Sequence, residues 1–347
     1  SRLVCMSKPN EAPRAANMYD VARLAGVSHQ TVSRVINENA SVSEVTREKV
    51  QAAMAQLNYR PNRAARSLAT ARTKLLGVLA SDTGQFGPAS LMHAIEHSAR
   101  EAGYFAVASS VDGQSRDSIA EGMTQLLELG VEALIVIAPQ EAVLDVAKSL
   151  SMNLPMVTID SSNRMDVFTV AVDNYSGARL AVRHLIEAGH KQILHVRGPI
   201  GWVEAEARVK GYRDELEAHG LKVHDVVQGD WSSQTGWIVG QQLAKRINEF
   251  TGIFVANDHM VLGLLHAFKD AGISVPVDVS VVGFDDLPDA AHFAPPLTTI
   301  RQNFHEVGRR AVALLLDELT GVESIRHEQI VPQLVKRDSV AAPSRNL

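Results

Sequence analysis

The stretch Tyr19-Asp-Val-Ala-Arg-Leu-Ala-Gly-Val-Ser-His-Gln-Thr-Val-Ser-Arg-Val-Ile-Asn37 predicts two short helices separated by a tight turn at Gly26. Polar side chains of the second helix are left facing outward. The pattern is typical of a helix-turn-helix, in which the first helix braces the second against the major groove of DNA. The spaced apolar side chains that can pack the two helices together are Ala22, Leu24, Val27, Val32, Val35 and Ile36.

The second helix carries side chains suited to DNA at its leading end. Ser28 is a good N-cap, because its hydroxyl can accept a hydrogen bond from a free backbone N–H. Glutamine can pair with adenine and arginine with guanine, while hydroxyl groups can bind phosphate. An ordinary helix pair with a solvated polar face is the alternative, which the neighbouring basic residues disfavour. The candidate DNA-binding residues here are His29, Gln30, Thr31, Ser33 and Arg34.

Charge is unevenly distributed along the 347 residues. Residues 18–74 hold nine basic and four acidic side chains, a net charge of +5, whereas the whole chain carries −5. The remainder therefore carries −10. Because residues 18–74 are positively charged and the rest of the chain is acidic, the attraction to phosphate is confined to one end of the chain.

Composition bounds the class of protein. Hydrophobic residues make up 46% of the chain but aromatic residues only 5%, which predicts a mainly aliphatic core. The single cysteine, Cys5, excludes an internal disulfide framework and favours a reducing cytoplasm. Residues 1–17 lack the apolar region of a secretory signal and are predicted to be a disordered tail. No apolar run approaches membrane-spanning length, so we expect a cytoplasmic, nucleoid-associated protein.

The helix pair is followed by a third helix and a short alanine-rich segment. Ser43 is expected to cap a helix over Glu44–Leu57, and proline at Pro61 ends it. The segment Arg63–Ala71 is too short to be a stable helix alone in water. It is either a plain linker or a helix that forms only with a partner, with Leu68 as its one large apolar side chain. The buried stripe of the third helix is predicted to be Val45, Val50, Ala53, Met54 and Leu57.

From Leu75 onward, short apolar strands alternate with amphipathic helices. This alternation indicates parallel sheets covered by helices on both faces. About ten strands exceed one typical sheet, so we expect two doubly wound lobes with a cleft between them. The predicted strands are 75–80, 105–110, 133–138, 155–160, 168–172, 192–197, 223–227, 252–256, 280–283 and 298–300.

Polar residues follow the carboxyl ends of several of these strands, where ligands bind in such sheets. Arg208 and Trp231 lie close after two further strand ends. Carboxylates, an amide, an arginine and an indole together favour a sugar site, because planar polar groups bind paired hydroxyls and an aromatic ring covers the apolar sugar face. Taken singly, each is better explained as a loop cap or a packing residue. The strand-end residues are Asp82, Asp160, Asn257, Asp258, Asp285 and Asp286.

Signatures of enzymes, metals and cofactors are weak. The sequence has no Gly-x-Gly-x-x-Gly, no Walker loop and no Gly-x-Ser-x-Gly. His93 and His97 share a helix face, but they lack the glutamate of a zinc motif. We therefore expect a protein that is not an enzyme and that binds neither a metal nor a cofactor.

The chain resembles the LacI/GalR family of transcriptional repressors from Tyr19 to its end. The resemblance implies a DNA-binding headpiece, a hinge helix and a periplasmic-binding-protein-like core whose chain crosses between its lobes three times. The segments that carry it are Gln30-Thr-Val-Ser-Arg-Val, Thr46-Arg-Glu-Lys-Val, Leu57-Asn-Tyr, Pro61-Asn-Arg, Gly229-Asp-Trp-Ser, Val255-Ala-Asn-Asp, Ser280-Val-Val-Gly-Phe-Asp-Asp, Pro296-Leu-Thr-Thr-Ile and Leu334-Val-Lys-Arg.

The resemblance also implies roles for particular residues. Leu68 falls where a pair of hinge leucines wedges into the minor groove and kinks the operator, and Asn62 and Ala65 fall on the same DNA-contacting segment. Asp82 and Phe86 lie on an N-lobe loop that closes over the effector. The other implied effector contacts are Asp160, Arg208, Trp231, Asn257, Asp285 and Gln302.

The resemblance further implies domain boundaries. They are the tail (1–17), the headpiece (18–61), the hinge (62–73) and the core (74–347). Within the core, the N-lobe takes 74–173 and 304–331, and the C-lobe takes 174–303 and 332–347. The chain shows no leucine heptads before Leu347, so a dimer is expected.

Three positions depart from the family pattern. His29 stands where a family member has tyrosine, Glu204 where it has a small residue, and Asp82 where it has serine. The first bears on operator choice and the other two on which sugar fits.

The function expected from the sequence is a dimeric repressor of sugar catabolic genes. It binds a palindromic operator, and a small sugar, most simply a galactoside, releases it. Two alternatives stay open. One is a corepressor-type relative whose ligand promotes DNA binding, and the other is a solute-binding sugar receptor, which would need an export signal and no basic headpiece.

Overall fold

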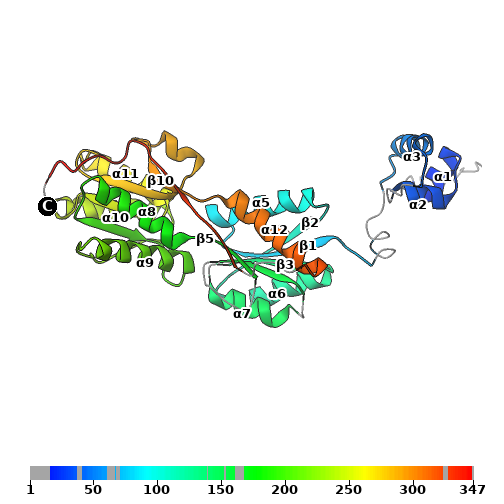
Figure 1. The fold of residues 1–347 in the computed structure, drawn as a ribbon, viewed down its shortest axis with the longest axis horizontal. Helices are drawn as coiled ribbons and strands as arrows, with labels where there is room; N and C mark the ends of the chain where they lie inside the picture. Colours follow the sequence, from blue (N-terminus) through cyan, green and yellow to red (C-terminus); the bar gives the residue numbers. More distant parts are fainter. Residues whose placement is uncertain are drawn as a thin grey trace, which may run out of the picture. The chain divides into compact units, whose positions relative to one another are not determined.

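The structure, a computed structural model, describes residues 16–36, 41–60, 67, 71–138, 140–151, 154–160, 168–322 and 327–345. The chain divides into two compact units, residues 1–73 and 74–347 (Figure 1). Across these described ranges, none of the helices has the length and apolar character needed to traverse a bilayer.

The described residues of the first unit include the helices α1 (Met18–Ala25), α2 (His29–Ile36) and α3 (Glu44–Gln56). Asn17 caps α1 in a reciprocal arrangement with Asp20, and Gly26 ends the helix in the left-handed conformation at φ 65°. This turn sets the angle between α1 and α2. The helices close over a small aliphatic core made of Val21, Ala22, Val32, Val35, Val50 and Ala53.

Two predictions for this small core were wrong. Leu24 is 44% exposed, because it lies about 160° around the helix from the buried Ala22. Val45 is 63% exposed, because it lies about 140° around its helix from Val50. Ser43 does precede α3, but its side chain makes no capping hydrogen bond to the helix backbone.

The second unit begins with a six-stranded parallel sheet in the order β11-β5-β4-β3-β1-β2. Helices α5 (Phe86–Glu101) and α12 (Phe304–Thr320) cover one face. Helices α6 (Arg116–Glu128) and α7 (Glu141–Leu150) cover the other. This is the N-lobe. Its strands are β1 (Leu75–Ser81), β2 (Phe105–Val111), β3 (Ala133–Ile137), β4 (Met156–Ile159), β5 (Phe168–Val172) and β11 (His327–Ile330).

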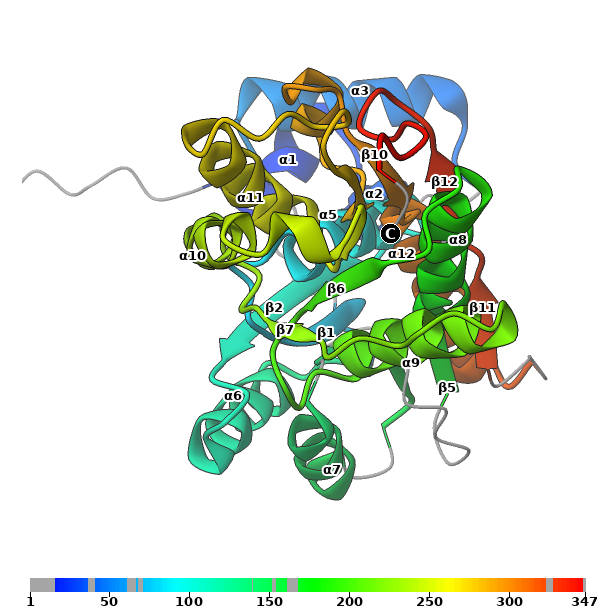
Figure 2. The ribbon, with the colours of Figure 1, turned by 90° about the vertical axis from the view of Figure 1, so that its left-hand side faces the viewer.

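The C-lobe repeats the same layering with the strand order β12-β10-β9-β8-β6-β7. Helices α8 (Asn174–Glu187) and α9 (Val203–Ala218) cover one face of this sheet, and α10 (Ser233–Ala244) and α11 (Asp258–Asp270) cover the other (Figure 2). Short 3-10 helices span Ile247–Glu249 and Pro288–His292. The strands are β6 (Ile193–Arg197), β7 (Val227–Gln228), β8 (Gly252–Val255), β9 (Ser280–Asp285), β10 (Thr298–Arg301) and β12 (Gln333–Val335).

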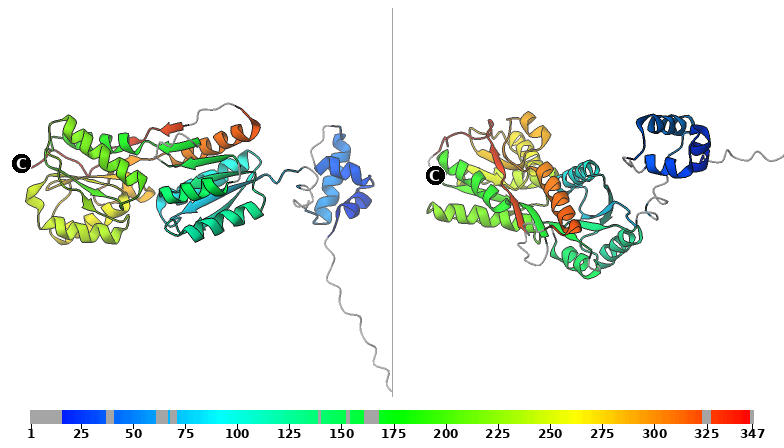
Figure 3. Two further views of the ribbon diagram at one scale, coloured as in Figure 1. Left: turned by 90° about the horizontal axis from the view of Figure 1, so that it is seen from below. Right: turned by 45° about the vertical axis from the view of Figure 1, so that its right-hand side comes forward.

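The chain passes between the lobes three times: from β5 to α8, from β10 to α12, and from β11 to β12 (Figure 3). The two expected doubly wound lobes are thereby confirmed. Sequence patterning missed β11 and β12, which are short and lie beside the crossings. The strand predicted over 223–227 is reduced to Val227–Gln228, because β7 is an edge strand that pairs with β6 at two positions only.

Candidate functional site

The outer face of α2 presents the residues predicted to read DNA. The Ser28 hydroxyl accepts a hydrogen bond from the Thr31 backbone N–H at 3.1 Å, which confirms it as the helix cap. Gln30 and Arg34 are exposed one turn apart on the same face. The His29 ring stacks on Tyr19 of α1, with ring centroids 4.5 Å apart. The stacking holds the imidazole at the leading end of α2.

Two hydroxyl groups on α2, those of Thr31 and Ser33, are not simply outward-facing as predicted. The Thr31 hydroxyl lies 2.9 Å from the Ser28 hydroxyl, so it belongs to the cap as well as to the exposed helix end. Ser33 is half-buried. Asn62, Ala65 and Leu68 of the predicted hinge lie outside the described residues.

A cleft of about 750 Å³ lies between the two lobes of the second unit. It brings together seven of the eight predicted effector residues from both lobes. Those seven are Phe86, Asp160, Arg208, Trp231, Asn257, Asp285 and Gln302.

Arg208 is the most firmly held polar group of the cleft. Its side chain is buried, and its Nε donates a hydrogen bond to Asn174 Oδ1 at 2.8 Å. Nη1 donates to the backbone carbonyl of Ala256, and Nη2 lies 4.0 Å from Asp285 Oδ1. The guanidinium also lies 3.8 Å from the ring centroid of Phe284. These contacts fix the plane of the guanidinium, which a ligand can then meet with paired oxygens.

Trp231 and Asn257 are linked in the wall beside Arg208. Asn257 Nδ2 donates to the Trp231 carbonyl at 3.0 Å, and Asn257 Oδ1 caps α11 by accepting from the Met260 N–H at 3.0 Å. The Trp231 side chain is buried, yet its Nε1 makes no hydrogen bond to the described residues. The indole therefore offers a free donor to a ligand.

Gly198 makes room for the Trp231 ring. A Cβ atom at position 198 would lie 2.0 Å from the indole, closer than any real contact. The position of the indole therefore depends on this glycine, which directly follows β6.

Asp285 and Gln302 form a second buried pair in the cleft. Gln302 Nε2 donates to Asp285 Oδ1 at 2.6 Å. Burial raises the pKa of the Asp285 carboxyl to about 6, although Arg208 and Gln302 oppose the shift. Asp285 also has a φ of 112°, a strained conformation for an aspartate. Strain and a perturbed pKa in one residue are typical of a ligand site.

The N-lobe loop differs from the prediction at one residue. Phe86 lines the cleft and packs edge-on against Phe304, with ring centroids 5.8 Å apart. Asp82 is not part of the cleft lining, because its carboxylate accepts a hydrogen bond from Gln140 Nε2 at 2.7 Å. Gln140 in turn accepts from the Ser81 hydroxyl at 2.9 Å. Asp82 therefore belongs to a loop-stabilising chain beside the cleft.

Two other strand-end aspartates are structural. Asp258 is buried, accepts hydrogen bonds from Thr299 and from the Leu287 N–H, and has a pKa raised well above its usual range by burial and by Asp285. Asp286 pairs with Arg301 and Arg337 at 2.6 and 2.7 Å. Within the described ranges, no group of histidine, cysteine, aspartate or glutamate side chains is arranged to hold a metal ion.

Asn174, Trp202 and Glu204 are among the cleft residues that were not predicted as effector contacts. Asn174 begins α8 just after Asp173, the residue that follows β5, so the strand-end rule could have found it. Trp202 precedes α9 and packs edge-on against Trp231, with centroids 5.5 Å apart. Glu204 in the first turn of α9 was noted only as a departure from the family. Neither Trp202 nor Glu204 directly follows a predicted strand end, so only the folded arrangement places them in the cleft.

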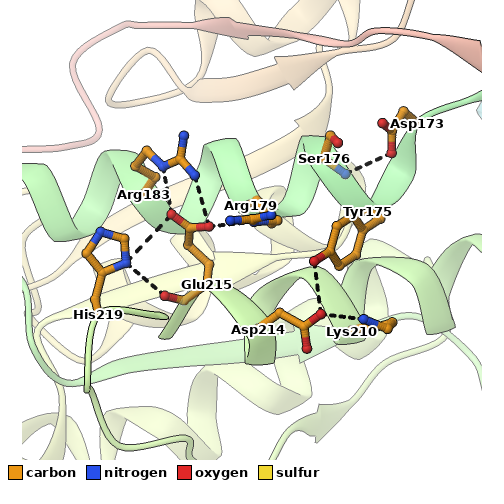
Figure 4. Close-up of polar contacts among 9 residues, drawn as sticks. All are labelled: Asp173, Tyr175, Ser176, Arg179, Arg183, Lys210, Asp214, Glu215 and His219. Carbon is orange, nitrogen blue, oxygen red and sulfur yellow. Dashed lines mark hydrogen bonds and ion pairs between the residues drawn. The ribbon is translucent and has the colours of Figure 1, made fainter. Parts of the chain in front are cut away.

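The helix that carries Glu204 and Arg208 is clamped to its neighbour α8 (Figure 4). Glu215 of α9 is fully buried and accepts hydrogen bonds from Arg179 and Arg183 of α8, each at 2.6 Å. Burial alone would raise the pKa of Glu215, but the hydrogen bonds from Arg183 and Arg179 outweigh it and hold the pKa below its usual range. Asp214 accepts a further hydrogen bond from Tyr175 at 2.9 Å. The clamp fixes the register of α9 beneath the cleft.

Comparisons with known proteins agree with this architecture. A family model described as bacterial regulatory proteins, lacI family, matches residues 17–62, and one described as a periplasmic binding protein-like domain matches residues 182–340. The chain is 37% identical to the lactose operon repressor of Escherichia coli (strain K12), covering 95% of this chain and 92% of that protein. It is 33% identical to the HTH-type transcriptional repressor PurR of Haemophilus influenzae, covering 94% and 98%.

Solved structures give the same result. The chain is similar to a lac repressor dimer bound to operator and the anti-inducer ONPF, with a TM-score of 0.86, 36% identity, and coverage of 95% of this chain and 100% of that one. It is also similar to a complex of the transcriptional regulator CelR with cellobiose, with a TM-score of 0.71, 29% identity, and coverage of 93% and 99%.

A helix-turn-helix unit joined to a two-lobed, periplasmic-binding-protein-like core defines a DNA-binding regulator with a ligand cleft. The chain belongs to the LacI family and is a DNA-binding transcriptional repressor. Its named relatives are repressors and not enzymes.

Proposed function

We propose that this protein is a cytoplasmic repressor of sugar catabolic genes that a small sugar, most simply a galactoside, releases from its operator. The observation that carries the proposal is the joint placement of an indole, a guanidinium, an amide and carboxylates around one cleft. Such a set binds vicinal hydroxyls in pairs and covers the apolar face of a pyranose. The lactose operon repressor and the cellobiose complex of CelR are consistent with a sugar.

The proposed mechanism couples the cleft to the DNA through the N-lobe. A dimer places two α2 helices on the half-sites of a near-palindrome. The residues 63–71 pair across the dimer on the operator, with Leu68 entering the minor groove and Asn62 and Ala65 beside it. Sugar binding favours an arrangement of the lobes in which this pairing is lost. Ligand and operator then disfavour one another by about 1–3 kcal/mol.

The test is a fluorescence anisotropy titration with the full-length protein. The DNA is a duplex that the protein has selected from a random-sequence library, and the ligands are D-galactose, methyl β-D-galactoside, lactose and cellobiose. We expect at least one sugar to weaken operator binding. If every sugar leaves operator affinity unchanged, the proposal fails.

A second outcome distinguishes the corepressor alternative, which the PurR relatives keep open. A purine base added to the same titration would then tighten operator binding. Trp231→Ala should retain operator binding and lose the sugar response. Loss of both would show that the substitution disrupts the fold.

A further inference from the structure

Glu204 lies in the cleft with one of its two carboxyl oxygens unpaired among the described residues. It is the second residue of α9, one helical turn before Arg208, so both side chains lie on one face of the helix. The residue lines the cleft, and its Oε2 atom is buried without a hydrogen-bond partner among the described residues. A buried oxygen of this kind costs free energy until a ligand binds it.

Acidic side chains outnumber cationic ones among the described residues that line the cleft. The lining includes three carboxylic acids, Asp160, Glu204 and Asp285, and the cationic Arg208. The guanidinium is engaged with Asn174, the Ala256 carbonyl and the neighbourhood of Asp285. Glu204 is the acid that presents to the cleft a carboxyl oxygen without a hydrogen-bond partner among these residues.

Aromatic rings border the same region. Trp202 lies two residues before Glu204, and its ring meets Trp231 edge-on. A positively charged nitrogen is attracted both to carboxylates and to the faces of indole rings. A neutral hydroxyl is only weakly attracted to the face of an indole ring.

We propose that the effector carries a positively charged nitrogen, as in an amino sugar, and that Glu204 is the residue that selects it. This inference rests on the proposed function, in which the cleft binds a small sugar. An ammonium group would satisfy the buried Oε2 atom by a charge-assisted hydrogen bond.

The protonation state of Glu204 predicts whether ligand affinity rises or falls with pH. Burial raises the pKa of Glu204 to about 7, Arg208 lowers it and Asp160 raises it. A bound ammonium favours the ionised form, so affinity for an amino sugar should rise from pH 5.5 to 7. A neutral sugar is held better by the protonated acid, and its affinity should fall over that range. Asp285, with its own raised pKa, also titrates here, so the comparison must include a Glu204 variant.

The experiment is isothermal titration calorimetry on the full-length protein. The probes are D-galactosamine and D-glucosamine, their neutral N-acetyl forms, and D-galactose and D-glucose. We expect one amine to bind about 30-fold more tightly than its parent sugar, and Glu204→Gln to remove that preference while leaving the parent within threefold. Glu206→Gln is the matched control, because Glu206 lies on the same helix, is half exposed and pairs with Arg197 outside the cleft lining.

Each result decides the proposal. A neutral parent that binds as tightly as its amine, or a preference that survives Glu204→Gln, overturns it. If Glu204→Gln loses operator binding, Glu204→Asp replaces it and should keep part of the preference. Amines that bind through Glu204 without changing operator affinity would uphold this inference and overturn the proposed function. If none of these sugars binds, this inference fails, and the proposed function is still decided by the operator titration with methyl β-D-galactoside, lactose and cellobiose.

Discussion

The two walls of the cleft are chemically different. The C-lobe wall presents Arg208, Asn257 and Asp285, each held by a hydrogen bond to its own lobe or to the adjoining crossing. The N-lobe wall presents mainly apolar side chains, with Asp160 as its carboxylate. Those apolar residues include Phe86, Leu91, Ile137, Ile159, Val172, Phe304 and Val307.

Because of this difference, the C-lobe wall orients the ligand and the N-lobe wall encloses it. Hydrogen bonds are directional, so a ligand takes its orientation from the C-lobe wall. Apolar contacts are non-directional, so the N-lobe wall can slide across the same ligand with little loss. A lobe movement that alters the N-lobe is therefore compatible with a ligand that stays fixed on the C-lobe. Such a division suits a repressor whose DNA-binding unit precedes the N-lobe in the chain.

The largest expected effect comes from removing the centre of the polar wall. Arg208→Ala leaves Asp285 buried without its countercharge and Asn174 without its donor, so we expect a loss of about 3–5 kcal/mol in the free energy of unfolding of the core. Ligand binding should be lost as well. Urea unfolding and calorimetry measure the two effects. Arg208→Lys should recover part of the stability, and a ligand affinity within threefold of the original protein would contradict the assignment of orientation to this wall.

A second prediction uses Glu204, a half-buried acid on the same wall whose Oε2 atom is buried. The pKa of Glu204 is raised in the folded protein, so its contribution to stability is complete below the unfolded pKa and is lost as pH rises through about 7. Glu204→Gln should match the original protein near pH 4.5 and exceed its free energy of unfolding at pH 8 by on the order of 2 kcal/mol. Buried histidines titrate equally in both proteins and cancel in the difference. A difference that does not change with pH would show that Glu204 is not buried as an acid.

The sequence predicted the polar wall better than the apolar one. Asn257 and Asp285 of the C-lobe wall, like Asp160 of the N-lobe wall, lie at the ends of strands with long apolar runs, and parallel strands bring their carboxyl ends to one edge. The lobes and the helix-turn-helix were predictable for the same reason, since periodic patterns extend over many residues. The family resemblance supplied Phe86, which no local pattern marks as a ligand contact, and Gln302, which directly follows β10.

The failures have physical causes. Leu24 and Val45 lie on short helices, where one residue shifts a side chain by about 100° and decides its burial. Asp82 stands at a strand end but is held by Gln140, a contact 58 residues away in the sequence. Trp202 and Glu204 enter the cleft because of the angle at which α9 meets the sheet. Such contacts depend on tertiary packing, which periodicity does not encode.

A third prediction compares the glycine beside the Trp231 ring with one in the N-lobe loop. Gly198→Ala places a Cβ within 2.0 Å of the Trp231 ring, so the indole must move. We expect a loss of about 1–2 kcal/mol in stability and about tenfold weaker ligand binding, with operator binding retained. Gly84→Ala in the N-lobe loop is the control, because nothing lies within 4 Å of the added carbon. Equal effects of the two substitutions on ligand affinity would remove the distinction between the walls.

The smallest expected effect belongs to the apolar wall. Leu91 on α5 lines the cleft and is almost fully buried. Leu91→Met conserves volume and keeps the side chain apolar, so the cost in stability should stay below about 1 kcal/mol. Because the wall encloses the ligand without orienting it, the affinities for different sugars should change by less than about threefold and in the same direction. Calorimetry with two sugars that differ at one hydroxyl checks this. If the substitution reverses their order, the N-lobe wall takes part in selecting the ligand, and orientation is shared between the lobes.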